Sequence, residues 1–349
     1  MIRTALALWH DWRGRPPRAS RTRSAGALLG VILLLLAGGL VDATAADQRA
    51  KPLLIGALTE SWGPTPAIIG LRDGLVELGY RENEDFVLGI RFTQGSAEEL
   101  PRAARQLVER GADILVTGGG GANEARALQQ ATSRVPVVFM SGGDPVSEGL
   151  VKSFARPGGN VTGVADLDVE LAPKRLEIFR ELVPGLKRVL FAYDAGDPFA
   201  VTQLDRYREA ARRLGLALIE RPVRTQPEAQ RVFANVPKSE VDGLLSPRFL
   251  SLNIPGFIIE AGLRQSVPTM LHTSYFVEQG GLASYAANLY ELGRHAARLV
   301  DRIIKGARPA DIPVEQATRF ELVINMKTAR ALGLAIPQSL LQRADKVIE

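Results

Sequence analysis

The sequence predicts an α/β protein with two doubly wound parallel-sheet lobes joined by a three-segment hinge. A length of 349 residues suits two core-forming units. From Lys51 onward, short aliphatic runs alternate with longer amphipathic stretches, the pattern of parallel strands joined by crossover helices. The alternation starts again after residue 166. The chain beyond residue 288 is too long for a tail and too short for a third domain, so we expect it to cross back.

The first series of elements contains four strands joined by three helices. Pro101 falls in the first turn of its helix, and Gly79 and Gly111 close the helices before them, as start and stop signals predict. The expected strands are 53–58, 86–92, 113–117 and 135–140, and the expected helices are 66–79, 96–110 and 121–132.

The second series follows the segment 160–166 and ends with a long helix and a final strand. Its expected strands are 188–194, 216–223, 242–247, 267–273 and 320–325, and its expected helices are 170–183, 199–215, 226–236, 253–265 and about 288–306. We assign residues 51–163 and 284–322 to lobe 1, and residues 164–283 and 323–349 to lobe 2. The strand ends of the two lobes would then face each other across a cleft, where ligands bind in such sheets.

The first 45 residues predict a cleaved signal peptide. Six arginines precede an uncharged apolar run at 25–41, and small residues follow at Ala43 and Ala45. Cleavage after Ala45 or Ala46 would release the body into the periplasm. The run is short for a spanning helix, and an uncleaved membrane anchor is the alternative.

Net charge and cysteine content exclude several classes. Of the formal net charge of +5, residues 1–45 carry +4, so the body is nearly neutral and has little electrostatic drive toward nucleic acid. The sequence contains no cysteine, so it has neither a lipoprotein attachment site nor a disulfide framework.

Candidate catalytic residues are scarce. His10 belongs to the signal peptide, and His272 and His295 lack a partner at metal-ligand spacing, so we expect no zinc site. His295 fits a helix surface, whereas His272 is either a cleft wall or a structural residue. Since no nucleophile and base pair is evident, we expect no enzyme, no cofactor and no metal.

Three turns at strand ends are open to two interpretations each. The glycines at 118–121 make either a tight strand-to-helix turn or a loop whose N–H groups hold a ligand carboxylate. The turns SGGDP (141–145) and DAGDP (194–198) either cap the helices that follow or present an aspartate from each lobe to one cationic group. A metal held by Asp194 and Asp197 would lack further oxygen ligands.

Two stretches closely resemble one known family. VPVVFMSGGDPVSEGLVKSFARPGGNVTGV (135–164) and PVEQATRFELVINMKTARALGLAIPQSLLQRADKVIE (313–349) resemble ABC transporter substrate-binding proteins. GLVELGY (74–80), GGLASYAANL (280–289) and VDRIIKGARPADIPVEQ (300–316) fit the same family, which includes binders of tryptophan and other aromatic amino acids. The resemblance implies the type I periplasmic binding protein fold and a monomer that delivers a small ligand to a permease in the inner membrane.

The resemblance also implies which residues contact the ligand, at the carboxyl ends of several strands. These residues are Thr59, Glu60, Ser61, Gly119, Gly120, Gly121, Ser141, Gly142, Asp144, Asp194, Asp197 and Ser246. Asp144 is the preferred contact, because Gly142 and Gly143 let the backbone approach a bound molecule closely.

Two departures from the family pattern bear on the ligand. The glycine loop (119–122) lacks the hydroxyl of related loops, and DAGDP carries an aspartate where many relatives have asparagine. Both positions are expected ligand contacts. An amino acid or a related small carboxylate remains the expected ligand. The alternatives are a sensory module that serves a membrane receptor and an exported α/β enzyme.

Overall fold

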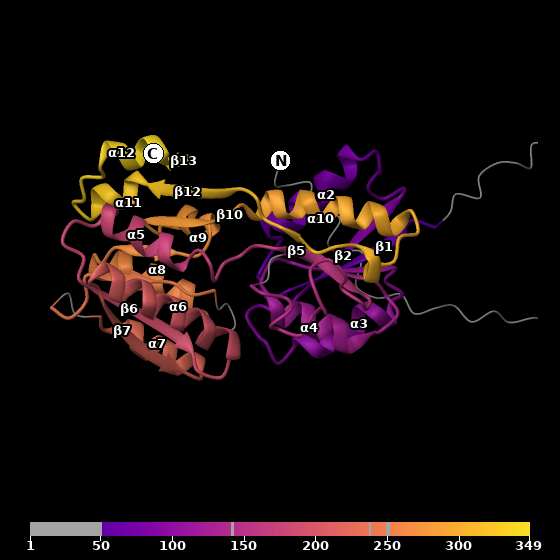
Figure 1. Ribbon diagram of the computed structural model, residues 1–349, viewed down its shortest axis with the longest axis horizontal. Helices are drawn as coiled ribbons and strands as arrows, with labels where there is room; N and C mark the ends of the chain where they lie inside the picture. The colour runs from indigo at the N-terminus through magenta and orange to yellow at the C-terminus, as the bar shows by residue number, and fades with distance from the viewer. Residues whose placement is uncertain (1–50, 141–142, 237–238, 249–251) are drawn as a thin grey trace, which may run out of the picture. The chain divides into compact units, whose positions relative to one another are not determined.

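The computed structural model describes residues 51–140, 143–236, 239–248 and 252–349. These residues form two α/β lobes, each built around one sheet (Figure 1). The ladders between the named strands are parallel except for the one that joins β10 to β12. The predicted fold class is confirmed. The predicted signal peptide, residues 1–45, lies outside the described residues.

The first lobe contains a six-stranded sheet in the order β11-β5-β4-β3-β1-β2. Its strands are β1 (Leu53–Thr59), β2 (Phe86–Phe92), β3 (Ile114–Thr117), β4 (Val137–Met140), β5 (Val161–Ala165) and β11 (Glu315–Gln316). Its helices are α2 (Pro66–Glu77), α3 (Leu100–Glu109), α4 (Ala122–Ala131), α10 (Leu289–Ile304) and the short 3₁₀ helix η1 (Pro309–Asp311).

Local sequence explains the ends of these elements. Thr65 caps α2 by accepting a hydrogen bond from the Ile68 N–H (3.3 Å), and Pro66 occupies the first helical position. Gly79 and Gly111 follow α2 and α3 with φ values of +97° and +80°, which glycine adopts without strain. The strands β3 and β4 are buried along their whole length, as expected for a parallel sheet covered on both faces.

The second lobe contains a seven-stranded sheet in the order β13-β12-β10-β9-β8-β6-β7. Its strands are β6 (Arg188–Asp194), β7 (Ala217–Val223), β8 (Gly243–Leu245), β9 (Thr269–Leu271), β10 (Ala283–Ala287), β12 (Phe320–Asn325) and β13 (Lys346–Ile348). Its helices are α5 (Ala172–Leu182), α6 (Pro198–Leu214), α7 (Gln226–Ala234), α8 (Ile254–Gln265), α9 (Ser274–Glu278), α11 (Met326–Ala331) and α12 (Gln338–Arg343).

The chain crosses between the lobes three times. The crossings join β5 to α5, β10 to α10, and β11 to β12. β10 and the start of β12 were expected in lobe 1, within 284–322, but both are hydrogen-bonded in the second sheet. β10 and β12 form an antiparallel ladder with each other, so both strands belong to the same sheet. That sheet is the one of the second lobe, which moves both strands out of the predicted lobe 1. The second and third crossings therefore lie at residue 288 and residues 317–319.

The returning helix α10 packs closely against α2 in the first lobe (Figure 1). A Cβ atom at Gly293 would overlap the Ala67 carbonyl oxygen, and one at Gly70 would overlap the Tyr290 carbonyl oxygen. Glycine at both positions therefore lets the two backbones approach. This contact holds α10, which lies between the second and third crossings, in the first lobe.

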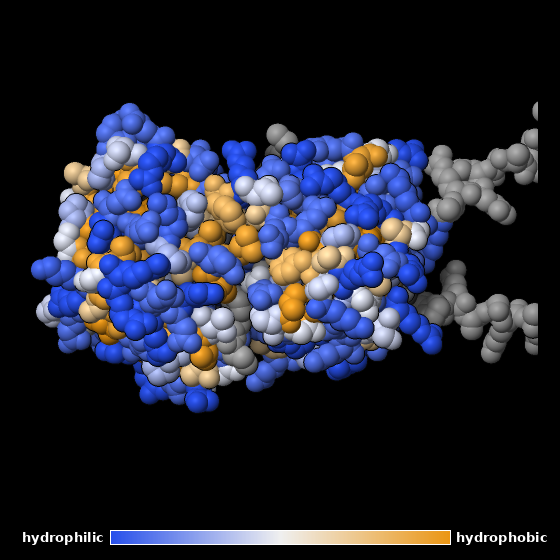
Figure 2. All heavy atoms as spheres, viewed as in Figure 1, coloured by the Kyte–Doolittle hydropathy of each residue, from blue (hydrophilic) through white to orange (hydrophobic). Residues whose placement is uncertain are grey.

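Hydrophobic and hydrophilic residues are interspersed on the surface that Figure 2 shows, where small groups of hydrophobic residues are scattered among hydrophilic ones. In the described ranges, no helix has both the length and the apolar character needed to cross a membrane.

Candidate functional site

A cavity of about 300 Å³ is lined by residues of both lobes. The first lobe contributes the loop after β1 and the glycine loop after β3. The second lobe contributes Arg248, the start of α8, and the segment from His272 to Gln279. The volume lies at the lower end of the range for small-molecule sites. The carboxyl ends of β1, β3, β8 and β9 therefore meet at one cavity, as expected for parallel sheets.

Aromatic side chains form much of the cavity wall. Trp62 from the first lobe and Tyr275 from the second line the cavity while remaining 56% and 43% exposed. Phe276 is buried beside Tyr275, with ring centroids 5.2 Å apart in an edge-on arrangement, and lies 5.4 Å from the His272 ring. Exposed aromatic surface of this size gains free energy when a ligand ring covers it.

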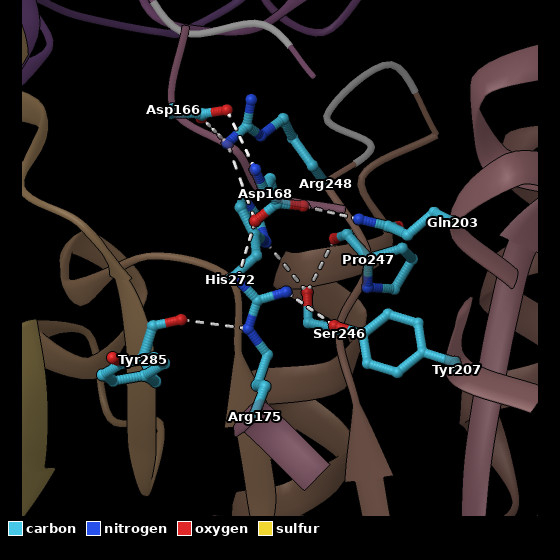
Figure 3. A network of polar contacts seen from close by, with 10 residues as sticks. All are labelled: Asp166, Asp168, Arg175, Gln203, Tyr207, Ser246, Pro247, Arg248, His272 and Tyr285. Carbon is cyan, nitrogen blue, oxygen red and sulfur yellow. Dashed lines mark hydrogen bonds and ion pairs between the residues drawn. The ribbon is translucent and has the colours of Figure 1, made fainter. Parts of the chain in front are cut away.

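Arg248 is the only charged side chain among the described residues that line the cavity. It follows β8 and forms ion pairs with Asp166 and, at 3.7 Å, with Asp168 (Figure 3). Both aspartates lie on the first crossing segment. A guanidinium has five donors in a planar fork, enough to hold aspartates on one edge and a ligand carboxylate on another.

A buried polar network is joined to Arg248 through Asp168. The Arg175 guanidinium donates to Asp168 (2.7 Å), to the Tyr207 hydroxyl (2.6 Å) and to the Tyr285 carbonyl oxygen (3.1 Å) (Figure 3). The Gln203 amide donates to the other Asp168 oxygen (2.5 Å). Burial opposes ionisation of Asp168, but the two arginines lower its pKa to about 2. This carboxylate is therefore charged at neutral pH.

His272 borders both the cavity and this network. Burial, together with the nearby arginines, lowers its pKa to about 3, so the imidazole is neutral at pH 7. Its Nδ1 lies 3.2 Å from the Ser246 hydroxyl, which donates to the Pro247 carbonyl oxygen (2.9 Å). Of the two interpretations of His272, the structure therefore supports the cavity wall.

The glycine loop is occupied by a side chain of its own lobe. The Glu124 carboxyl group accepts hydrogen bonds from the N–H groups of Gly118 (2.8 Å), Gly120 (3.2 Å) and Glu60 (2.9 Å). Burial still raises the pKa of Glu124 to about 7. Glu124, in the first turn of α4, thus already accepts from the N–H groups of Gly118 and Gly120, which favours the interpretation of this loop as a tight strand-to-helix turn.

The structure brings four of the predicted contact residues to the cavity. These four are Thr59, Ser61, Gly119 and Gly120. Six others lie outside its described lining: Glu60, Gly121, Asp144, Asp194, Asp197 and Ser246. Ser141 and Gly142 lie outside the described residues. The prediction that these twelve residues contact the ligand stays a prediction.

Two of the aspartates have local roles. Asp144 Oδ1 accepts from the Val146 N–H (3.0 Å), and Asp194 Oδ1 accepts from the Gly196 N–H (2.7 Å). Each side chain thus closes its own turn, as short polar side chains do in such turns. These contacts favour the structural interpretation of both residues, and the expected contact of Asp144 with the ligand stays a prediction.

Trp62, Arg248, Tyr275 and Phe276 were missed by reasoning from the sequence. Arg248 comes two residues after Ser246, and Tyr275 and Phe276 come two and three residues after the end of the expected strand 267–273. Extending the strand-end rule by three residues would have found all three. Trp62 had no such signal. Among the described residues, no group of three or more histidines and carboxylates is arranged to hold a metal ion.

Comparisons with known proteins agree on one family. A family model described as "ABC transporter substrate binding protein" matches residues 62–348. The chain is 25% identical over 291 residues to a tyrosine-binding protein of Clostridioides difficile (strain R20291), covering 82% of each. A crystal structure of the ABC domain from Streptococcus pneumonia in complex with L-Trp is 29% identical, with a TM-score of 0.76, and covers 85% of this chain and 100% of its own. A conserved domain protein from Vibrio cholerae O1 biovar eltor str. N16961 is 28% identical, with the same TM-score and coverage.

Proposed function

Because the chain belongs to the ABC transporter substrate-binding protein family, we propose that it is the exported solute-binding component of an ABC importer and captures an aromatic amino acid or a related small carboxylate. Its two lobes have the type I periplasmic binding protein fold. In this proposal the ligand closes the lobes, and a permease in the inner membrane receives it from the closed protein.

The proposed ligand class rests on the residues that line the cavity. Its aromatic wall suits a planar ring, and its single charged lining residue in the described chain, Arg248, suits a carboxylate. Contacts from both lobes stabilise only the closed state, so a ligand that fills this cavity favours closure. Relatives of this chain include one named for tyrosine and one solved with L-Trp, which supports the same class.

Calorimetric titration of the mature protein tests the ligand class. We expect L-tryptophan, L-tyrosine or L-phenylalanine to bind at least about 30-fold more tightly than L-leucine, because a buried ring covers the aromatic wall and a branched aliphatic chain covers less of it. The same ligands should raise the melting temperature, since they bind only the folded state. Tighter binding of L-leucine or of D-glucose would overturn the proposed class.

The N-terminus of the exported protein tests the predicted cleavage of the signal peptide. Mass spectrometry of the material secreted by the native host should find a mature chain that begins at Ala46 or Asp47, because small residues at Ala43 and Ala45 suit signal peptidase. A membrane-bound species that retains residues 25–41 would show an uncleaved anchor instead.

A further inference from the structure

His272 is a buried side chain within the aromatic wall of the cavity. It directly follows β9, lines the cavity and is 5% exposed. Its ring centroid lies 5.4 Å from that of Phe276, with 59° between the ring planes. Phe276 lines the same cavity and packs edge-on against Tyr275. A ligand ring that covers this wall therefore comes close to the His272 imidazole.

The Ser246 hydroxyl determines which imidazole nitrogen carries the proton. The hydroxyl has one proton and donates it to the Pro247 carbonyl oxygen (2.9 Å) (Figure 3). The same hydroxyl lies 3.2 Å from His272 Nδ1, so in this second contact its oxygen accepts and Nδ1–H donates. A neutral imidazole carries a single N–H, and the hydrogen bond made by one nitrogen sets the state of the other. Nε2 therefore holds a lone pair and acts as an acceptor.

The surroundings of His272 keep the imidazole neutral. Burial is the main cause of its low pKa of about 3; Arg248 and Arg175 lower the pKa further, whereas Asp168 opposes them. Because this pKa lies below the ordinary value for histidine, the ring gains a proton only in strong acid and is neutral at pH 5 as well as at pH 7. Nε2 stays an acceptor throughout this range.

Nε2 is an acceptor without a partner. It accepts no hydrogen bond from any described residue. The fully enclosed polar atoms that lack a partner include Nδ1 of His295 but not Nε2 of His272, so open space reaches Nε2. His272 is otherwise buried and lines the cavity, which is that open space. A polar group in such a place is costly unless a bound molecule supplies its hydrogen bond.

We infer that Nε2 of His272 recognises the ring of the ligand by accepting a hydrogen bond from an indole N–H or a phenol O–H. The inference rests on the proposed function and narrows the ligand class to aromatic amino acids whose ring carries a donor. L-phenylalanine covers the same wall but leaves Nε2 unpaired. A site with a buried polar group rejects an analogue that lacks the matching group for this reason.

The ammonium group of an amino acid is a second donor, and the position of His272 favours the ring. Its imidazole packs against Phe276 in the aromatic wall. The charges of Arg248 and Arg175, which lower the pKa of His272, also disfavour another cation at the same place.

Calorimetry with matched ligand pairs tests the recognition of the ring. The pairs are L-tryptophan with 3-(3-benzothienyl)-L-alanine, in which sulfur replaces the indole N–H, and L-tyrosine with L-phenylalanine, which lacks the hydroxyl. All four keep the ammonium group and the carboxylate. We expect the tighter of the two donor-bearing ligands to bind about 10-fold or more tightly than its partner. The ratio should be the same at pH 5.5 and pH 7.5, because the imidazole is neutral at both.

Three variants locate the effect. His272→Phe keeps a ring against Phe276 and removes the acceptor, so both members of a pair should bind nearly equally. Ser246→Ala removes the acceptor of Nδ1–H, so part of the protein should carry the proton on Nε2 and the preference should weaken. His295→Phe is the matched control, because this histidine of α10 lies outside the cavity lining, and it should keep the wild-type preference.

The wild-type protein offers a test that needs no variant. The ¹⁵N chemical shifts of labelled histidine distinguish the Nδ1–H tautomer from the Nε2–H tautomer. We expect His272 to be in the Nδ1–H form in the ligand-free protein. The Nε2–H form would overturn the inference, because Nε2 would then donate.

Each failure has its own signature. If both members of each pair bind equally, or the analogue without the donor binds more tightly, the proposed ligand class stands and recognition by His272 is rejected. A preference that survives in His272→Phe also rejects it, because another group then binds the donor. If none of the four ligands binds, the proposed ligand class fails, and recognition by His272 fails with it.

Discussion

Replacing Asp168 by alanine is expected to lower the free energy of unfolding by about 3–5 kcal/mol, the usual loss when one partner of a buried ion pair is removed. Asp168 is 1% exposed and Arg175 is fully buried, so water cannot replace the missing carboxylate. Arg175 would keep only the Tyr207 hydroxyl and the Tyr285 carbonyl oxygen as acceptors for its buried charge. Arg248 would lose a neighbouring negative charge as well.

Urea denaturation of the two proteins measures this loss. Asp311→Ala is the matched control, because Asp311 pairs with Arg308 at 2.7 Å on an exposed surface, where such pairs contribute at most about 1 kcal/mol. Asp168→Asn should fall between the two, since its one amide oxygen can still accept from either Arg175 or Gln203 but carries no charge. Equal losses in Asp168→Ala and Asp311→Ala would show that the buried network does not stabilise the fold.

Replacing Arg248 by methionine is expected to weaken binding of L-tryptophan or L-tyrosine by about 2–5 kcal/mol, which is about 30-fold to several thousand-fold. Methionine keeps an apolar stem in the cavity wall and removes the guanidinium that would hold the ligand carboxylate. Tryptamine and tyramine lack that carboxylate, so their weaker binding should change little. Titration of wild type and variant with both ligand classes gives the comparison.

A control separates the carboxylate contact from support of the fold. Arg221→Met removes an exposed arginine of the same lobe and should leave all affinities unchanged. Thermal unfolding of Arg248→Met reports the separate effect of losing its ion pair with Asp166. If the amines lose as much affinity as the amino acids, Arg248 supports the cavity walls and does not hold the carboxylate.

Regular elements were predictable where hydrophobic pattern and turn chemistry agree. The strands 86–92, 188–194 and 320–325 match β2, β6 and β12 residue for residue. β10 was not assigned, because three of its five residues, ASYAA, are alanine, and the segment lacks the run of Val, Ile or Leu of a buried parallel strand. Its strand character depends on pairing with β12, which lies more than thirty residues further along the chain. That long-range pairing also explains why the expected lobe boundaries differ from the structure.

The candidate site was less predictable than the fold. The strand-end rule placed Thr59, Ser61 and the glycine loop at the cavity, because parallel strands bring their carboxyl ends to one edge. The same rule could not show which way a side chain turns. Glu60, between two lining residues, is not part of the described lining, and Glu124 accepts hydrogen bonds from the glycine loop in which a ligand carboxylate was one of two expectations. Such orientations depend on contacts between loops that follow different strands of the first lobe, which local sequence does not encode.

The return of α10 to the first lobe has a consequence for the order in which the protein assembles. Domains of a nascent chain commonly form from the N-terminus onward, as each becomes available. Here the first lobe lacks α10 and β11 until residues 289–316 have been made, and the second lobe lacks β12 and β13 until residues 320–348 have been made. We therefore expect neither lobe to complete its core until nearly the whole chain is available. The usual order of folding, in which an N-terminal domain finishes before the next one begins, would not apply to this chain.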